Sequence, residues 1–169
     1  KPSTPVLLCL TLPCISEAEE SALSSNPSGV RVVSYYGYDD CIELRNEQTR
    51  VVLCPAAGGR VLEYSLGGKN VLYLPPGSEG WRQTPDQPRG KMHAGRFDIG
   101  PEKMVRRGRV LWQGPWKSEI TGDRSARLTS QYDPESGVRL IRDFKLAANQ
   151  SQLVCTQTIR NESTRPVSL

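Results

Sequence analysis

The chain has 169 residues, a formal net charge of +4 and an ordinary charged fraction of 24%. This length suits one domain with one core, and the composition excludes a disordered or fibrous protein. The charge is uneven, because residues 82–127 contain eleven Lys or Arg against five Asp or Glu. These basic residues lie among Gly and Pro and form no long run or helical stripe, so we do not expect nucleic acid as a partner.

Residues 1–28 are predicted to be a signal-like segment and linker. Lys1 precedes an apolar run at 5–15, which changes to the acidic stretch 16–20, and this layout is typical of an export signal. The run is too short to span a bilayer stably, so we expect no stable membrane span. The alternative is an ordinary buried strand. The export interpretation places the protein in the periplasm or outside the cell.

Cysteines stand at positions 9, 14, 41, 54 and 155, and the first two lie within the signal-like segment. Removal of that segment would leave three, which allow at most one intrachain disulfide. The alternative is buried free thiols that pack as small hydrophobic side chains. No Cys-x-x-Cys pair or His-rich spacing suggests zinc, and we expect neither a metal nor another cofactor.

From Gly29 onward, apolar residues recur with a period of two, in short segments separated by Gly, Pro, Asn or Asp. This pattern predicts an all-β, antiparallel fold. Strands are expected at 30–36, 41–45, 49–54, 60–66, 71–74, 116–121, 126–132, 138–146 and 153–161. Hairpin-sized connections at 133–137 and 147–151 support antiparallel pairing of the last three.

Arg142 is the exception within the strand at 138–146, because it shares a face with the apolar residues Leu140 and Phe144. A charged group on a buried face needs a carboxylate, carbonyl oxygens or water as its partner. The two interpretations are a strand-end arginine that extends its charge to solvent and an arginine with a role in a site.

Residues 75–101 interrupt the regular pattern, because ten of these 27 residues are Pro or Gly. Long irregular loops in compact domains are usually functional or disordered, and this one carries Trp81, the only His and several Arg. His93 can donate or accept a proton near neutral pH, and Arg96, Asp98 and Glu102 follow closely enough to orient it or a ligand. The alternative is a plain surface histidine.

Trp81, Trp112 and Trp116 lie in or beside this irregular, basic region. Flat rings stack on the C–H faces of sugars, while Arg and carboxylate groups bond sugar hydroxyls. The alternative is that the rings pack in the core or at a domain interface. The sequence contains no phosphate-binding Gly loop, nucleophile elbow, metalloprotease motif or dinucleotide fingerprint, which argues against those enzyme classes.

Several segments resemble galactose mutarotase-like (aldose 1-epimerase-like) proteins. Residues 51–64, Val-Val-Leu-Cys-Pro-Ala-Ala-Gly-Gly-Arg-Val-Leu-Glu-Tyr, look like the early strand, Gly-Gly-Arg turn and next strand of that superfamily. Residues 70–73, Asn-Val-Leu-Tyr, are similar to the strand that follows, and 93–97 stand where the family carries a His-Gly-Gly segment. Residues 140–163 resemble its long central hairpin. The likeness covers 29–169 and is closest to uncharacterised exported bacterial members.

The resemblance implies a galactose mutarotase-like super-sandwich, an antiparallel β-sandwich of which 29–169 would be the N-terminal part, truncated at the C-terminus. In the epimerases a His acts as general acid, and a Glu from the distant C-terminal part acts as general base. His93 matches an early family His, but no residue here matches that Glu or the second catalytic His.

We therefore expect a carbohydrate-binding, mutarotase-like domain with a carbohydrate ligand as its partner. His93 is the candidate catalytic residue, and the candidate sugar-binding residues are Arg60, Arg96, Glu102 and Trp116. One alternative is an aldose 1-epimerase-type enzyme that uses His93 with a Glu outside this chain. A second alternative is a structural or interaction β-sandwich without a sugar site, which fully buried Trp residues would favour.

Overall fold

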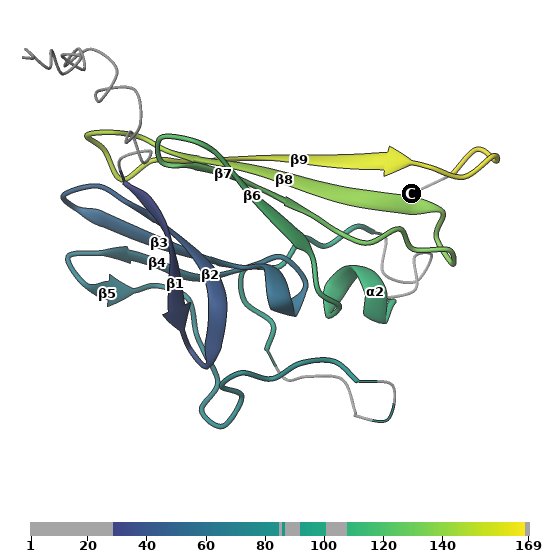
Figure 1. The fold of residues 1–169 in the computed structure, drawn as a ribbon, viewed down its shortest axis with the longest axis horizontal. Coiled ribbons are helices and arrows are strands. Elements are labelled where there is room, and N and C mark those ends of the chain that lie inside the picture. The colour runs from purple at the N-terminus through teal and green to yellow at the C-terminus, as the bar shows by residue number, and fades with distance from the viewer. Residues whose placement is uncertain (1–28, 85, 87–91, 101–107, 168–169) are drawn as a thin grey trace, which may run out of the picture.

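The computed structural model describes residues 29–84, 86, 92–100 and 108–167 (Figure 1). The predicted signal-like segment therefore lies outside the described residues. In chain order the elements are β1 (Val30–Tyr35), β2 (Tyr38–Arg45), β3 (Thr49–Cys54), the 3-10 helix η1 (Pro55–Ala57), β4 (Arg60–Leu66), β5 (Lys69–Asn70), α2 (Arg109–Trp112), β6 (Lys117–Gly122), β7 (Ser125–Thr129), β8 (Val138–Leu146) and β9 (Leu153–Asn161). In this described part, no helix has the length and apolar character needed to cross a membrane.

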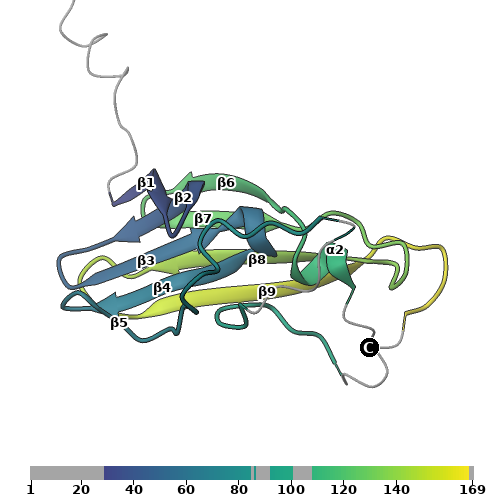
Figure 2. The ribbon, with the colours of Figure 1, turned by 90° about the horizontal axis from the view of Figure 1, so that it is seen from below.

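The strands form two antiparallel sheets in which neighbouring strands are also consecutive in the sequence. Sheet A has the order β1-β2-β3-β4-β5, and sheet B has the order β6-β7-β8-β9. Figures 1 and 2 show sheet B packed over sheet A, with the strands of both running in roughly the same direction. The prediction of an all-β antiparallel sandwich is confirmed.

The core between the sheets is built from the alternating apolar residues of facing strands. Leu44 and Leu53 of sheet A and Leu128 and Leu140 of sheet B are fully buried there. Their sequence neighbours point to the opposite faces, as a period of two requires. Burial of each such side chain stabilises the fold by roughly 1.5–3 kcal/mol, so the alternation read from the sequence is also the main source of stability.

Sheet A buries a second apolar cluster on its outer face, away from sheet B. Its members are Tyr38, Cys41, Val52, Cys54, Ala56, Ala57, Leu62 and Met92. The segment after β5 covers this face and runs below sheet A in Figure 1. The Tyr38 hydroxyl donates a hydrogen bond to the carbonyl oxygen of Trp81 (2.6 Å). The described part of the loop predicted at 75–101 is thus a third layer, packed on the sandwich.

Asn46, in the turn between β2 and β3, ties one end of the sandwich together. Its Oδ1 accepts hydrogen bonds from the backbone N–H groups of Gln48 (3.0 Å) and Thr49 (2.8 Å). Its Nδ2 donates to the carbonyl oxygens of Ala147 (2.8 Å) and Gln150 (2.7 Å) in the β8–β9 turn. One side chain therefore joins a turn of sheet A to a turn of sheet B.

The strand predicted at 71–74 is wrong, because the chain leaves the sheet after β5. Asn70 Oδ1 accepts hydrogen bonds from the backbone N–H groups of Tyr64 (3.1 Å) and Leu72 (3.0 Å). Its Nδ2 donates to the carbonyl oxygen of Leu62 (2.9 Å). One backbone bond, from the N–H of Val71 to the carbonyl oxygen of Tyr64 (3.2 Å), continues beside β4, and the Asn70 side-chain bonds replace the rest of the ladder. Val71 and Tyr73, whose alternation suggested a strand, are 69% and 74% exposed.

Candidate functional site

The predicted Gly-Gly-Arg turn connects η1 to β4 and packs on a buried tryptophan. Gly59 has φ +59°, a conformation that Gly adopts without steric cost. A Cβ at this position would lie 2.4 Å from Cε3 of Trp116, so only Gly lets the ring approach so closely. Trp116 Nε1 donates to the carbonyl oxygen of Leu111 (3.0 Å), and the residue is 5% exposed. The structure thus places Trp116 in the core beneath the turn.

The other tryptophans also offer little open surface. Trp112, in α2, is 3% exposed and belongs to the core between the sheets. Trp81 is half-buried in the loop over sheet A. The burial of Trp112 and Trp116 agrees with a packing role and leaves neither ring exposed as a stacking surface for a sugar.

Arg142 of β8 joins sheet B to two glycine-rich segments. Its Nη1 donates to the carbonyl oxygens of Gly59 (2.8 Å) and Gly95 (2.7 Å). The guanidinium also stacks on the Phe144 ring, 4.8 Å from its centroid. Burial lowers the pKa of Arg142. The expected partner of this buried charge is therefore a pair of carbonyl oxygens, and the arginine holds the Gly-Gly-Arg turn and the His93 segment in place.

Arg60, the last residue of the turn, is almost completely buried at 2% exposure. Its Nη2 donates to the carbonyl oxygen of Trp112 (2.9 Å), while its Nε and Nη1 are sealed from solvent without a hydrogen-bond partner. Burial, followed by the charge of Arg96, lowers the pKa of Arg60 to about 10. The side chain therefore stays cationic at neutral pH, although it cannot touch a ligand directly.

His93, Arg96 and Asp98 are brought together at the surface near this buried charge. Arg96 Nε donates to Asp98 Oδ2 (2.7 Å), and Arg96 Nη1 lies 3.4 Å from His93 Nδ1. Because an arginine N–H can only donate, this contact assigns the accepting role to Nδ1 and the imidazole proton to Nε2. His93 is exposed, and the side chain of Asp98 is 46% exposed. We call Arg60, His93, Arg96 and Asp98 the arginine site.

A backbone hydrogen bond and the close approach of Gly95 hold the His93 segment against β4 of sheet A. The N–H of Val61 donates to the carbonyl oxygen of Gly95 (2.9 Å), the same oxygen that Arg142 contacts. Gly95 has φ +67°, and a Cβ there would lie 1.9 Å from the carbonyl oxygen of Val61. Arg96 is thereby carried on a backbone that lies directly on β4, next to Arg60.

This arrangement suits anion and hydroxyl binding better than proton transfer between an acid and a base. Within the described part of the chain, Arg96 is the side chain that hydrogen-bonds His93, and no carboxylate does so. Glu102, the fourth predicted sugar-binding residue, lies outside the described residues. Among the residues that are described, no group of three or more His, Cys, Asp or Glu side chains forms a candidate metal site.

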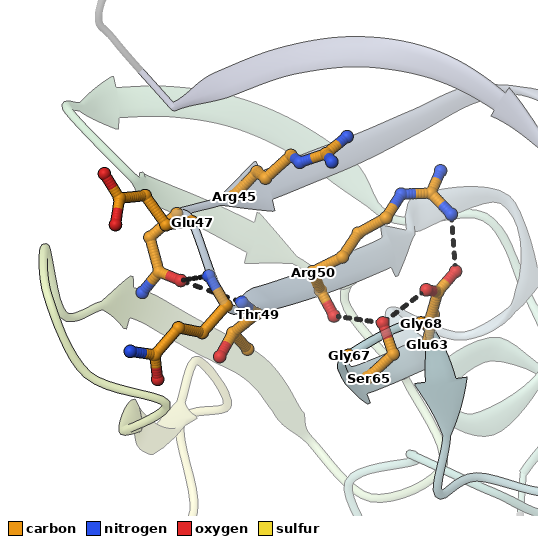
Figure 3. A pocket seen from close by; sticks show the side chains of 10 residues that line it. Arg45, Glu47, Thr49, Arg50, Glu63, Ser65, Gly67 and Gly68 are labelled. Atoms are coloured by element: carbon orange, nitrogen blue, oxygen red, sulfur yellow. Dashed lines mark hydrogen bonds and ion pairs between the residues drawn. The ribbon is translucent and has the colours of Figure 1, made fainter.

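A second polar site lies at the opposite end of sheet A from η1, where the β2–β3 and β4–β5 turns meet (Figure 3). This turn pocket has a volume of about 410 Å³. Arg50 Nη1 donates to Glu63 Oε2 (2.6 Å), and Ser65 Oγ donates to Glu63 Oε1 (2.7 Å). Arg50 Nε contacts Glu43 Oε2 at 2.5 Å. Both carboxylates already have partners, so these groups brace the sheet face rather than await a ligand.

The chain was compared with protein-family models, curated proteins and solved structures, and none of the three comparisons finds a match. The resemblance to mutarotase-like proteins therefore stays a prediction. The geometry of the arginine site, on an all-β sandwich, is the observation from which function is inferred.

The sequence analysis did not predict the turn pocket, although the alternation of residues along β2, β3 and β4 is consistent with it. Alternation places Glu43, Arg50, Glu63 and Ser65 on the same face of three adjacent strands, the face that carries Val52. Charged residues on strands normally indicate a solvent-facing surface. Here opposite charges lie on neighbouring strands, a pattern that indicates an ion-pair network. The network can be recognised in the sequence only when the register of the strands is known.

The lowered pKa of the Glu43 carboxyl predicts that the fold loses stability in acid. Burial raises the pKa of this carboxyl, but hydrogen bonds from Arg50 and Arg31, together with their charges, outweigh burial and lower it. A pKa that is lower in the folded state stabilises the fold above the ordinary value of 4.5, and this contribution is lost as pH falls through the lower folded-state pKa. We expect the urea midpoint to fall in that acid range.

Glu43→Gln should lower the midpoint at neutral pH and flatten its fall with acid, because the titrating group is gone. Glu119→Gln, on the exposed edge strand β6, is the matched control and should retain the wild-type pH profile. A Glu43→Gln profile parallel to that of the wild type would show that other carboxyls cause the acid sensitivity.

Proposed function

We propose that this chain binds a carbohydrate carrying an anionic group, through the surface that His93 and Arg96 form beside buried Arg60. The observation that carries the proposal is the uncompensated positive charge of the arginine site. Within the described residues, no carboxylate forms an ion pair with Arg60 or Arg142, and Asp98 is bonded to Arg96. The arginine site thus holds two guanidinium groups, those of Arg60 and Arg96, and one carboxylate, that of Asp98.

The two kinds of arginine act differently in this proposal. Arg60 is sealed from solvent, so it contributes an electrostatic field rather than a contact, and a field of this kind is screened less than that of a surface charge. Arg96 and His93 supply the contacts. The guanidinium and the Nε2–H of His93 are donors that suit a carboxylate or sulfate oxygen, and sugar hydroxyls can also accept from them.

The choice of carbohydrate rests on the family resemblance, and the choice of an anionic substituent rests on the charge. A sandwich fold by itself hosts many functions, so neither the fold nor the resemblance decides the ligand. A uronic acid or a sulfated sugar combines both features: hydroxyl groups for polar side chains and a negative group for the arginines.

The test measures binding of three oligosaccharides to the 169-residue chain by NMR line broadening and calorimetry: an oligogalacturonate, a sulfated oligosaccharide and a neutral cello-oligosaccharide. We expect the acidic probes to bind more tightly than the neutral one, with an affinity that falls as salt rises. Arg96→Ala should weaken binding of the acidic probes by roughly tenfold or more, the loss typical of one charge-assisted hydrogen bond. His93→Ala should weaken it less.

Arg127→Ala is the matched control, because Arg127 forms a similar ion pair with Asp143 (2.6 Å) on the solvent face of sheet B. It should leave binding unchanged. Equal binding of all three probes by the wild type would contradict the anionic preference while keeping a carbohydrate site. Acidic binding that Arg96→Ala does not change would remove the arginine site from the proposal.

A structural or interaction sandwich without a sugar site is the second candidate, and the burial of Trp112 and Trp116 favours it. Both rings belong to the core, so the aromatic platform common in sugar sites is missing at these two positions. This candidate predicts that none of the three probes broadens any resonance. The same experiment therefore separates the two functions.

A further inference from the structure

Two of the free cysteines, Cys41 and Cys54, lie side by side on neighbouring strands of sheet A. The β2–β3 register pairs Ile42 with Leu53 and Glu43 with Val52. The paired register ends at Ile42 and Leu53, and its continuation by one residue would set Cys41 opposite Cys54. Both belong to the cluster on the outer face of the sheet and both have an exposed fraction of 0%.

The register also determines the type of pair that they form. In an antiparallel pair of strands, hydrogen-bonded and non-hydrogen-bonded residue pairs alternate. The N–H of Asn46 donates to the carbonyl oxygen of Thr49 (3.1 Å), so these two residues form a hydrogen-bonded pair at the turn. Cys41 and Cys54 lie an odd number of residues further along, and therefore form a non-hydrogen-bonded pair.

Non-hydrogen-bonded pairs bring side chains closest, with Cα atoms about 4.5 Å apart, within the range of about 4.4–6.8 Å that disulfides require. Interaction with the Cys54 thiol, followed by burial, raises the pKa of the Cys41 thiol far above its usual range, and Cys41 Sγ also donates to the carbonyl oxygen of Tyr35 (3.9 Å). The bond therefore needs no change of the β2–β3 register.

Cys155 has a different environment. It lies on β9, the edge strand of sheet B, and packs against the core between the sheets, whereas Cys41 and Cys54 face away from that core. Sheet A therefore separates it from both. Among the cysteines of the described residues, Cys41 and Cys54 are therefore the one neighbouring pair.

We propose that Cys41 and Cys54 form a cross-strand disulfide when the protein folds in an oxidising environment, with a low-molecular-weight disulfide such as oxidised glutathione as the oxidant. One protein thiolate attacks a sulfur of the small disulfide, forms a mixed disulfide and releases one small thiol. The second protein thiolate attacks the protein sulfur of that intermediate and releases the other small thiol. The two protein S–H protons end on the released thiols, and the two electrons lost by the protein pair reduce the small disulfide.

The crosslink would act on the frame of the arginine site. Cys54 is the last residue of β3, directly before η1, and it is paired with Arg60 across β3 and β4. The disulfide would thus anchor the start of the Gly-Gly-Arg turn to β2. Because both sulfurs are sealed beneath the loop that covers sheet A, the bond forms before that layer closes and is afterwards protected from small reductants.

The experiment unfolds the full chain in urea with dithiothreitol and refolds it either in oxidised and reduced glutathione or in dithiothreitol alone. Free thiols are then alkylated, and tryptic peptides are analysed without reduction. Cleavage after Arg31, Arg45, Arg50 and Arg60 separates Cys41 on peptide 32–45 from Cys54 on peptide 51–60. We expect these two peptides to be linked after oxidative refolding, with a mass two hydrogens below the sum of their masses, and Cys155 to be alkylated.

Cys155→Ala is the control that should keep the link, and Cys41→Ala should leave Cys54 alkylated. The urea midpoint of the oxidised chain should exceed that of the reduced chain by roughly 1 M, and the Cys41→Ala/Cys54→Ala double variant should lose this dependence on reductant. Peptides 32–45 and 51–60 that are both alkylated after oxidative refolding, or that are linked to other cysteines, would overturn the proposal. A midpoint that rises on reduction would show that the native register does not fit the bond.

Discussion

Gly95→Ala is expected to lower the free energy of unfolding by roughly 3 kcal/mol or more, which corresponds to a fall in Tm on the order of 10 °C. The added Cβ would lie 1.9 Å from the carbonyl oxygen of Val61, which is backbone of β4 and cannot rotate away. The change also places a non-glycine residue at φ +67°. Relief of the clash requires the segment to move off β4, which breaks the hydrogen bonds that the Gly95 carbonyl oxygen accepts from Val61 and Arg142.

Urea unfolding followed by tryptophan fluorescence measures this effect, because Trp112 and Trp116 are buried. Gly77→Ala is the matched control: its φ is +78°, but nothing lies within 4 Å of the added Cβ. It should cost roughly 1 kcal/mol, the strain of the left-handed conformation alone. Equal losses for Gly77→Ala and Gly95→Ala would show that backbone strain, and not the contact with β4, determines the cost at position 95.

Arg142→Met is expected to lower the free energy of unfolding by roughly 2–3 kcal/mol. The methionine preserves much of the aliphatic packing, but it leaves the carbonyl oxygens of Gly59 and Gly95 without the donor that joins them. Hydrogen bonds to a charged group contribute about 1.5–3 kcal/mol each, and removal of a buried charge recovers part of that loss. Because the arginine holds both segments of the arginine site, acidic oligosaccharides should also bind Arg142→Met more weakly.

Chemical denaturation and calorimetric binding measure the two parts of this prediction. Arg127→Met, on the solvent face of sheet B, is the control and should leave the unfolding curve nearly unchanged. Arg142→Lys should recover the positive charge but not the geometry of the two contacts. Its free energy of unfolding should therefore lie between that of the wild type and that of Arg142→Met. Full stability of Arg142→Met would mean that the two carbonyl oxygens find other donors, and that the arginine is not the link between the sheets and the turn.

The strands could be predicted because their signals lie in residues that are close together in the sequence. Alternation of apolar residues determines which face of a strand is buried, and Gly, Pro, Asn and Asp mark the turns, so eight of the nine predicted strands correspond to observed ones. The exception, 71–74, failed because the Asn70 side chain bonds the backbone of β4 and turns the chain away. A side-chain bond of that kind has no signature in hydrophobic periodicity.

The arginine site was only partly predictable for the same reason. His93 and Arg96 are three residues apart in a glycine-rich loop, so their contact could be expected from the sequence. The sequence could not show that Arg60, at the start of β4, lies near them. Nor could it show the link from Arg142 on the other sheet, which joins positions 83 residues apart. Trp116 was expected to line the site because of its neighbours in sequence, but the absence of a side chain on Gly59 lets its ring pack inside.

By itself, the sequence determined the all-β class, the turns and the buried faces of the strands, because alternation and turn chemistry act between residues that are close along the chain. It also required a partner for the buried charge of Arg142. The tertiary structure decided what that partner is, which cysteines are adjacent and which tryptophans are covered. These depend on register and on the packing of one sheet upon the other, and such contacts form between residues whose separation in sequence leaves no periodic pattern.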